Sequence, residues 1–243
     1  MSSNTPADKP TSELFDALFP SGHTIAIDGD FIHGTGTIDD ETVCVIGTAN
    51  HAEIGVELAF AMAVAVLRTV KEHPGRAILL LVDTQGQRLR HRDELLGINA
   101  YMAHLAKCLE VARGAGHRIV SLVYGRAVSG GYLTTGMMAD SCHALESAEI
   151  SVMNLPAMAR VTKIAQERLE ELAASSPVFA PGAINYLKMG GLESLWSGKL
   201  VDALRDALHG KESADRRRER GLERGGRTTA LDVSRRVRGD ALD

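Results

Sequence analysis

Short apolar segments separated by turns open the ordered part of the chain. The segments Thr24–Ile27, Phe31–Thr35 and Thr42–Ile46 have strand length, and Asp28-Gly29 and Asp39-Asp40 stand between them. Strands bounded by such turn residues predict an antiparallel meander.

The apolar period then lengthens to about 3.6 residues from Glu53, which is the period of a helix. Pro74-Gly75 ends this predicted helix. A continuous apolar run, Ala77–Val82, follows at strand length. Such a run is typical of a parallel strand that is buried on both faces. It leads into a polar loop, expected over Asp83–Gln87.

The same order of helix and strand is repeated once. A second helix is predicted over Arg92–Arg113, with Leu95 on its buried face, and a second buried strand over Arg118–Tyr124. A glycine-rich loop, Gly125–Tyr132, comes next, and a helix is expected from there to Met138. This alternation predicts an α/β fold with right-handed crossovers.

Two short strands, Cys142–Leu145 and Glu149–Val152, and a helical region, Pro156–His209, complete the predicted elements. The helical region has more apolar positions than a monomer usually leaves uncovered, which predicts packing against another chain. The alternative is that these residues cover the sheet of their own chain. The helical pattern is broken at Pro177, Pro181 and Gly190-Gly191. The apolar positions are Met158, Val161, Ile164, Leu169, Leu172, Leu187, Leu195, Trp196, Leu200 and Leu204.

Composition places the chain among globular proteins. With 243 residues, 44% of them hydrophobic and 24% charged, a wholly disordered or fibrous chain is excluded. We predict one domain over residues 23–210, preceded by a flexible segment (1–22) with a short helical piece at 11–18. An Arg-rich tail, predicted to be disordered, covers 211–243. The tail carries a net charge of +3 and the rest −7, and an acidic body does not favour nucleic-acid binding.

The sequence suggests neither a metal site nor a disulfide framework. Cys44, Cys108 and Cys142 are far apart and form no CxxC pair. The histidines lack metal-ligand spacing and are expected in surface or capping roles. No secretory signal is recognised, and the most apolar stretch, Val56–Leu67, is too short to span a bilayer. A soluble cytoplasmic protein is predicted. The histidines considered are His51, His91, His104, His117 and His143.

Two loops at strand ends are the candidate sites, Asp83–Gln87 and Gly125–Gly131. Ligands of open α/β sheets bind outside the carboxyl ends of the strands. Glycines let backbone N–H groups point into a cavity, and a helix start leaves such groups unpaired. Together the loops offer two converging donors for a developing oxyanion. The alternative for Gly130-Gly131 is a tight turn, and no Gly-Lys-Ser/Thr follows as in a P-loop.

The order "VDTQG", "RAVSGGY" and "AEISVM" resembles the carboxyltransferase branch of the crotonase superfamily. Within that branch, "GRAVSGGYLTTG" and "PAMARVTK" are most similar to the gamma subunit of biotin-independent malonate decarboxylase. The likeness covers roughly Ile25–Leu208. The chain departs from the branch at Gln85, where many members have Pro, and at Gln87, where many have Phe.

The resemblance implies a crotonase-like spiral of ββα units with a helical C-terminal region. It also implies that two homologous chains face each other to form the active site. The reaction releases CO2 from a malonyl thioester on the prosthetic group of an acyl carrier protein, with no cofactor bound directly to this chain and no metal. The positions that match the oxyanion donors are Gly86, Gln87, Gly130 and Gly131, and those expected to bind substrate are Ser129 and Tyr132.

Two other functions fit the same motifs. One is half of a biotin-dependent carboxyltransferase, whose loops look alike, and the other is a non-catalytic scaffold that completes a partner's interface. The chain has one copy of the Gly-Gly loop after a buried strand. It therefore supplies one side of a two-sided site, and we predict that it depends on a homologous beta-type subunit. An acyl carrier protein is the second expected partner, and neither nucleic acid nor a membrane is expected.

Overall fold

A mixed sheet organises the chain. The computed structural model describes residues 8–153, 155–175, 181–210, 215–226 and 228–239. Within these ranges nine strands form one sheet in the order β1-β2-β3-β5-β6-β7-β9, while β4 pairs with β5 and β8 with β6. The strands are β1 (Ala26–Asp28), β2 (Phe31–Ile38), β3 (Glu41–Thr48), β4 (Ala52–Ile54), β5 (Ile78–Gln87), β6 (Ile119–Val128), β7 (Ser141–Leu145), β8 (Glu149–Ser151) and β9 (Ser194–Trp196).

The predicted meander is confirmed. β1, β2 and β3 pair antiparallel, and β2 and β3 meet in a hairpin in which Ile38 faces Glu41. Asp39 and Asp40 between them have φ angles of 46° and 66°. Two consecutive positive φ angles give the tight turn that matches the twist of a hairpin, and Asp tolerates this conformation better than most residues.

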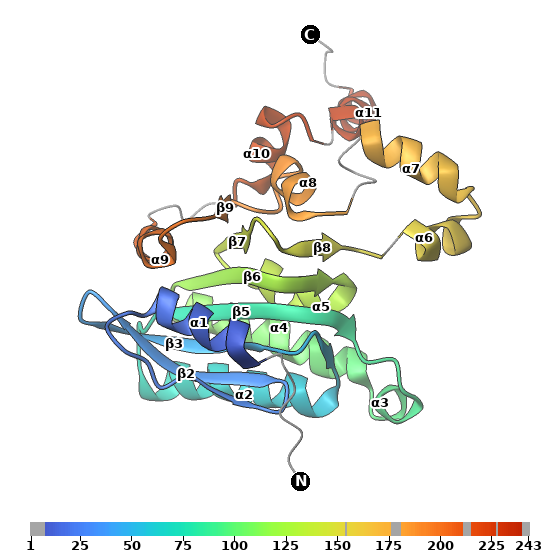
Figure 1. Ribbon diagram of the computed structural model, residues 1–243. Coiled ribbons are helices and arrows are strands. Elements are labelled where there is room, and N and C mark those ends of the chain that lie inside the picture. The colour runs from blue at the N-terminus through green and yellow to red at the C-terminus, as the bar shows by residue number, and fades with distance from the viewer. Residues whose placement is uncertain (1–7, 154, 176–180, 211–214, 227, 240–243) are drawn as a thin grey trace.

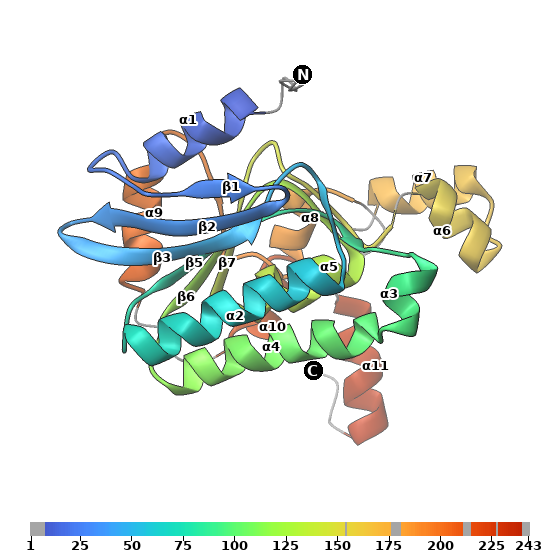
Figure 2. The same cartoon turned by 90° about the horizontal axis from the view of Figure 1, so that it is seen from below.

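The two continuous apolar runs form the buried parallel strands β5 and β6, as predicted. The helices α2 (Val56–Glu72) and α4 (Ile98–Gly114) cover one face of the sheet, and α1 (Asp8–Leu18) and α9 (Leu200–Leu208) cover the other (Figure 2). Leu80 and Val82 pack on the first side, while Leu79 and Leu81 pack on the second. The parallel pairs run from β3 through β5, β6 and β7 to β9.

Three predicted boundaries differ from the structure. The helix expected over Arg92–Arg113 is divided into α3 (His91–Leu95) and α4 by Gly97, whose φ is 77°. Leu95 therefore leaves the buried face and is 74% exposed. The polar segment Asp83–Gln87 is the end of β5, not a loop, because β4 pairs alongside it. The helical region also contains a strand, β9, paired with β7.

The short helical piece expected at 11–18 is confirmed within α1, whereas the N-terminal segment as a whole differs from the expectation of flexibility over residues 1–22. Residues 8–18 form α1, and Leu14, Phe15, Leu18 and Phe19 are buried against the sheet. The apolar side chains recur at helical spacing, so burial of this face stabilises the helix. Residues 1–7 lie outside the described part of the chain.

The segment 211–243 also departs from the expectation of disorder. Two helices occur there, α10 (Arg217–Glu223) and α11 (Thr228–Arg238). Arg224 anchors this segment, because its guanidinium donates to the carbonyls of Leu187, Leu192 and Glu193 at 2.8–3.0 Å. Residues 211–214, 227 and 240–243 lie outside the described residues.

The predicted helical region divides into a part that covers the sheet and a part that extends away from it. Trp196 and Leu204 are buried over the sheet. By contrast α6 (Leu155–Thr162) and α7 (Gln166–Ser175) project from the body (Figures 1 and 2), and Val161 is 67% exposed. The predicted break at Pro177 lies outside the described residues. Among the described helices, none is long and apolar enough to cross a membrane.

Candidate functional site

The ladder between β5 and β6 is interrupted near its carboxyl end, and Asp83 lies at the interruption. The register shifts between Val82 and Thr84. The buried Asp83 carboxylate accepts hydrogen bonds from the backbone N–H of His51 at 2.9 Å and of Arg126 at 2.8 Å. It thus satisfies two backbone donors at the point where regular strand pairing is broken.

Asp83 leaves no room for a side chain on the neighbouring strand. A Cβ atom on Gly125 would lie 2.4 Å from Asp83 Oδ1. Beside it, the Tyr124 hydroxyl donates to the Thr48 carbonyl at 2.9 Å, and burial raises the pKa of this phenol. Gly125 is therefore required for the close approach of β6 to the Asp83 side chain. This contact lies where the register between β5 and β6 shifts.

The same carboxylate orients His51, which the sequence assigned to a surface or capping role. His51 Nδ1 lies 2.6 Å from Asp83 Oδ1, and about half of the imidazole is exposed. His51 and the preceding Asn50 have φ angles of 52° and 60°, which are uncommon outside glycine. The contact with the carboxylate fixes the orientation of the imidazole. The sequence carries no signal for this pair, because its members are 32 positions apart.

The two candidate segments, Asp83–Gln87 and Gly125–Gly131, come into contact at the end of β5 and are called the glycine segments below. The helix α5 (Ser129–Thr134) begins directly after β6. A Cβ on Gly131 would lie 2.7 Å from the Cα of Gly86, and a Cβ on Gly130 would lie 2.4 Å from Gln87 Oε1. Only glycine permits this approach of the first turn of α5 to β5. The N–H groups of this first turn have no acceptor within the helix.

Thr84 ties the end of β5 to β4. Its hydroxyl donates to the Ala52 carbonyl at 2.7 Å and accepts from the Gly86 N–H at 2.9 Å. The structure thus differs from the expectation at Gly86, whose N–H was a candidate oxyanion donor. That N–H already has an acceptor inside the protein. Gly86, with a φ of 102°, instead provides the backbone bend on which Gly131 rests.

The two expected substrate-binding residues occupy different environments. Ser129 is exposed, with a φ of 51°, at the start of α5. Tyr132 is 2% exposed and packs edge-on against Tyr186 at a centroid distance of 6.1 Å. Burial raises its pKa well above the usual range, and its hydroxyl has no hydrogen-bond partner among the described residues. Tyr132 therefore belongs to the core under α5, whereas Ser129 faces outward.

An ion pair that sequence patterns did not reveal fixes the segment after β5. Arg88 donates to both oxygens of Asp93, at 2.8 and 2.9 Å, and the Val56 N–H donates to the same carboxylate at 3.0 Å. The hydrogen bonds from Arg88 and Val56 lower the pKa of Asp93 to about 2. The arginine also packs against Gly55, where a Cβ would lie 2.1 Å from its guanidinium. This contact joins α3 to the start of α2 beside the glycine segments.

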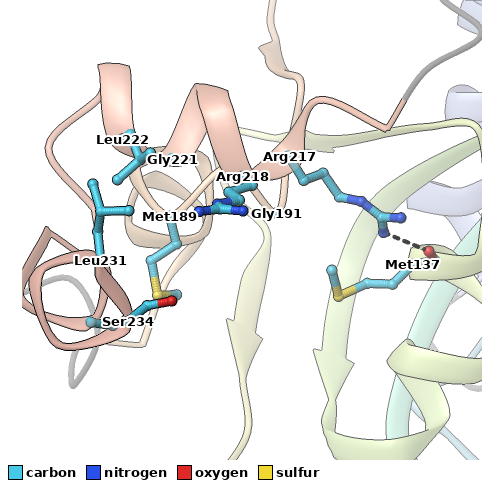
Figure 3. Close-up of a pocket in the computed structure, with 10 residues that line it drawn as sticks. Met137, Met189, Gly191, Arg217, Arg218, Gly221, Leu222, Leu231 and Ser234 are labelled. Atoms are coloured by element: carbon cyan, nitrogen blue, oxygen red, sulfur yellow. Dashed lines mark hydrogen bonds between the residues drawn. The ribbon is translucent and has the colours of Figure 1, made fainter. Parts of the chain in front are cut away.

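A separate apolar cavity lies under the C-terminal helices. It has a volume of about 550 Å³ and lies between the short 3₁₀ helix Gly136–Met138, α8 (Ala183–Lys188), α10 and α11. Met137 and Met189 line it, and Arg217 closes one side by donating to the Met137 carbonyl at 3.0 Å (Figure 3). None of the six residues assigned to the candidate site lines this cavity, so it is distinct from the glycine segments.

Metal ligands and disulfides play no part in the geometry described. Among the residues that the structure describes, no group of three or more His, Cys, Asp or Glu side chains is placed to hold a metal ion. Cys44, Cys108 and Cys142 are free thiols.

The register of β5 and β6 is irregular near their carboxyl ends, and two glycine segments are in contact there; the fold is that of the crotonase-like carboxyltransferases. A family model for the malonate decarboxylase gamma subunit matches residues 49–241, and the chain belongs to this family.

Solved structures of Pseudomonas malonate decarboxylase are similar over nearly the whole chain. A hetero-tetramer in complex with coenzyme A contains a chain with a TM-score of 0.74 and 28% identity, and the match covers 93% of this chain and 97% of that one. An MdcD-MdcE hetero-dimer gives a TM-score of 0.70, 27% identity and the same coverage.

A curated relative is the malonyl-S-ACP:biotin-protein carboxyltransferase MADD of Malonomonas rubra. It is 40% identical over 164 residues, which are 64% of this chain and 56% of that protein. The match thus spans little more than half the length of this relative.

Proposed function

We propose that this chain is one of two homologous subunits that decarboxylate a malonyl thioester carried by an acyl carrier protein. Its family, the gamma subunits of malonate decarboxylase, supports the reaction class. The observation that carries the proposal is the contact of Gly131 with the backbone of Gly86, which holds the first turn of α5 open at the end of β5. The substrate arrives on the prosthetic group of the carrier, and this chain binds no cofactor itself.

The chemistry requires stabilisation of one developing negative charge. The C–C bond to the carboxylate breaks, CO2 leaves, and the electron pair moves onto the thioester as an enolate. A proton from water then gives the acetyl thioester. The N–H groups of Gly130 and Gly131 donate to the enolate oxygen, because they open α5 without an intrahelical acceptor. Gly86 and Thr84 position this turn, and Ser129 lies beside it at the surface.

Gln87 contributes through its side chain. Its Oε1 occupies the space where a Cβ of Gly130 would lie, so the amide covers one side of the turn. Gln85 and Gln87 are both exposed. Polar side chains at these two positions, where many carboxyltransferases have Pro and Phe, form the rim of the proposed site.

The homologous partner is proposed to cover the side of the molecule to which β5 and β6 point. On this side α3, α6 and α7 all extend outward from the sheet (Figures 1 and 2). These helices, their flanking segments and α5 expose large apolar side chains, more than isolated surface positions require. An association of this kind occurs in the Pseudomonas MdcD-MdcE hetero-dimer. The exposed residues are Leu89, Leu95, Leu96, Leu133, Val152 and Val161.

The test is copurification of the native complex, followed by measurement of CO2 release from malonyl-carrier protein. We expect decarboxylation by the complex and none by this chain alone. A stable monomer that decarboxylates the thioester unaided would contradict the dependence on a partner. The cytoplasmic location stays a prediction and is checked by cell fractionation of the same strain.

A second candidate function is transfer of the carboxyl group to a biotin protein. The name of the Malonomonas rubra relative, which is 40% identical, favours it. Avidin, which sequesters biotin, distinguishes the two candidates in the same assay. Decarboxylation that avidin leaves unchanged supports direct release of CO2, and loss of turnover with avidin supports the transferase.

A further inference from the structure

A cavity of about 250 Å³ lies at the opposite end of β5 from the glycine segments. It is formed by β2, β3 and the C-terminal end of α2. The pairing of Cys44 with Ile78 places this cavity at the start of β5, whereas Gly86 is near its end. Ten strand residues span up to about 30 Å, so a ligand in this cavity does not reach the proposed active site. The chemically distinctive lining residues are His33, Cys44, Arg68, Thr69, His73 and Arg76.

The lining is cationic although the chain as a whole has a net charge of −4. The guanidinium groups of Arg68 and Arg76 have no hydrogen-bond or ion-pair partner among the described residues, and no described lining residue is acidic. The charge of Arg76 acts on the Cys44 thiol, whose pKa is raised by burial and lowered in part by this guanidinium. Two unpaired guanidinium groups on one small cavity favour an anion with two charges.

The backbone that presents these cations is fixed by hydrogen bonds. The Arg76 N–H donates to the His73 carbonyl at 3.1 Å, and the His73 N–H donates to Thr69 at 2.9 Å. The Arg76 carbonyl in turn lies 2.8 Å from Nδ1 of the buried His117. The backbone of the turn that carries His73 and Arg76 is therefore held on both sides.

Two polar groups that line the cavity, Thr69 and Cys44, are paired with each other. The buried Thr69 hydroxyl donates to the Ala65 carbonyl at 3.0 Å and lies 3.1 Å from Cys44 Sγ. The thiol therefore donates to Thr69 Oγ1. These two groups satisfy each other, whereas the guanidinium groups have no partner among the described residues.

We propose that this cavity binds a small dianion, either a phosphate or a dicarboxylate, in contact with Arg68 and Arg76. The site is separate from the proposed decarboxylation site. Its existence does not depend on the proposed function, because the argument uses only the charge and geometry of this cavity.

The test is calorimetric titration of the full-length chain with inorganic phosphate and, separately, with malonate, in a chloride buffer of constant ionic strength. We expect saturable binding of at least one of them with a dissociation constant of about 1 mM or tighter. Arg68→Gln and Arg76→Gln are expected to weaken it about tenfold or more. Arg160→Gln removes an exposed arginine on α6 and is the matched control, expected to leave the affinity unchanged.

Alkylation of Cys44 provides an independent readout. Cys108 and Cys142 are buried, whereas Cys44 is partly exposed on the cavity. At ten times the dissociation constant, bound anion should slow alkylation of Cys44 about tenfold by mass action. Absence of saturable binding for both anions overturns the proposal. So does binding that survives both Arg68→Gln and Arg76→Gln, or that leaves Cys44 fully reactive.

Discussion

Replacement of Gly131 by alanine tests the proposed site most directly, since it adds a single methyl group at the closest approach of α5 to β5. The added Cβ would lie 2.7 Å from Gly86 Cα, 3.0 Å from Gly86 C and 3.0 Å from Thr84 Oγ1. Two of these atoms belong to the backbone and cannot rotate away. The first turn of α5 must therefore move off β5, and its N–H groups move with it.

The size of the effect follows from these contacts. Overpacking of this kind costs about 1–3 kcal/mol of stability, which lowers the melting temperature by about 2–4 °C per kcal/mol in a domain of this size. Displacement of an oxyanion donor lowers kcat about 100-fold or more. Activity is thus expected to fall far more than stability.

The assay compares CO2 release from malonyl-carrier protein by complexes assembled with each variant. Gly114→Ala is the matched control, because no atom lies within 4 Å of a Cβ at this position and its φ is not positive. Gly114 ends α4, where alanine favours the helix over glycine. Gel filtration shows that both complexes are assembled, and thermal melting shows that both are folded. An assembled Gly131→Ala complex with unchanged kcat would refute the oxyanion role and favour a scaffold.

Three further outcomes are expected. Gly130→Ala should lower kcat only slightly, and adding Gln87→Ala should restore kcat, because the added Cβ would meet a side-chain oxygen, Oε1 of Gln87. A double-mutant cycle in kcat that shows no coupling between the two positions would contradict this. Asp83→Ala should cost about 3 kcal/mol in urea unfolding, since it leaves two backbone N–H groups without their acceptor. Hydrogen bonding from Arg88 lowers the pKa of Asp93 to about 2. The stabilisation that results from this lowered pKa is present in full above pH 3.8, the pKa of the unfolded chain, and is lost as the pH falls toward 2. In Asp93→Asn the free energy of unfolding should therefore depend less on pH in that range.

The parts of the fold that the sequence revealed are those determined by local hydrophobic pattern. Ala77–Val82 and Arg118–Tyr124 are apolar at nearly every position, and such runs are buried on both faces whatever surrounds them. The extension of β5 through Asp83–Gln87 was missed because its residues are polar. Pairing with β4 and contact with α5 hold it as a strand, and neither contact has a local signature.

The candidate site could be predicted only in part, because its contacts between distant segments also have no local signature. The glycine pair at 130 and 131 is visible as a motif, yet its function depends on Gly86, which is 45 positions away. Thr84 accepts the Gly86 N–H, and its own hydroxyl donates to Ala52 of β4, a partner 32 positions away that no local pattern reveals. Tyr132 follows the glycines directly, and the short helix turns its ring into the core. Its role in substrate binding stays a prediction.

The C-terminal region combines the two alternatives that its apolar positions left open. Leu204 and Trp196 cover the sheet of their own chain, which is the role expected of a self-contained domain. Val161 on α6 and Leu95 on α3 are exposed on the side toward which β5 and β6 run. Burial of one such side chain contributes about 1.5–3 kcal/mol. We therefore propose that α3 and α6, beside the glycine segments, contact the partner and that α9 does not, so that association with a second subunit and completion of the proposed site involve the same surface.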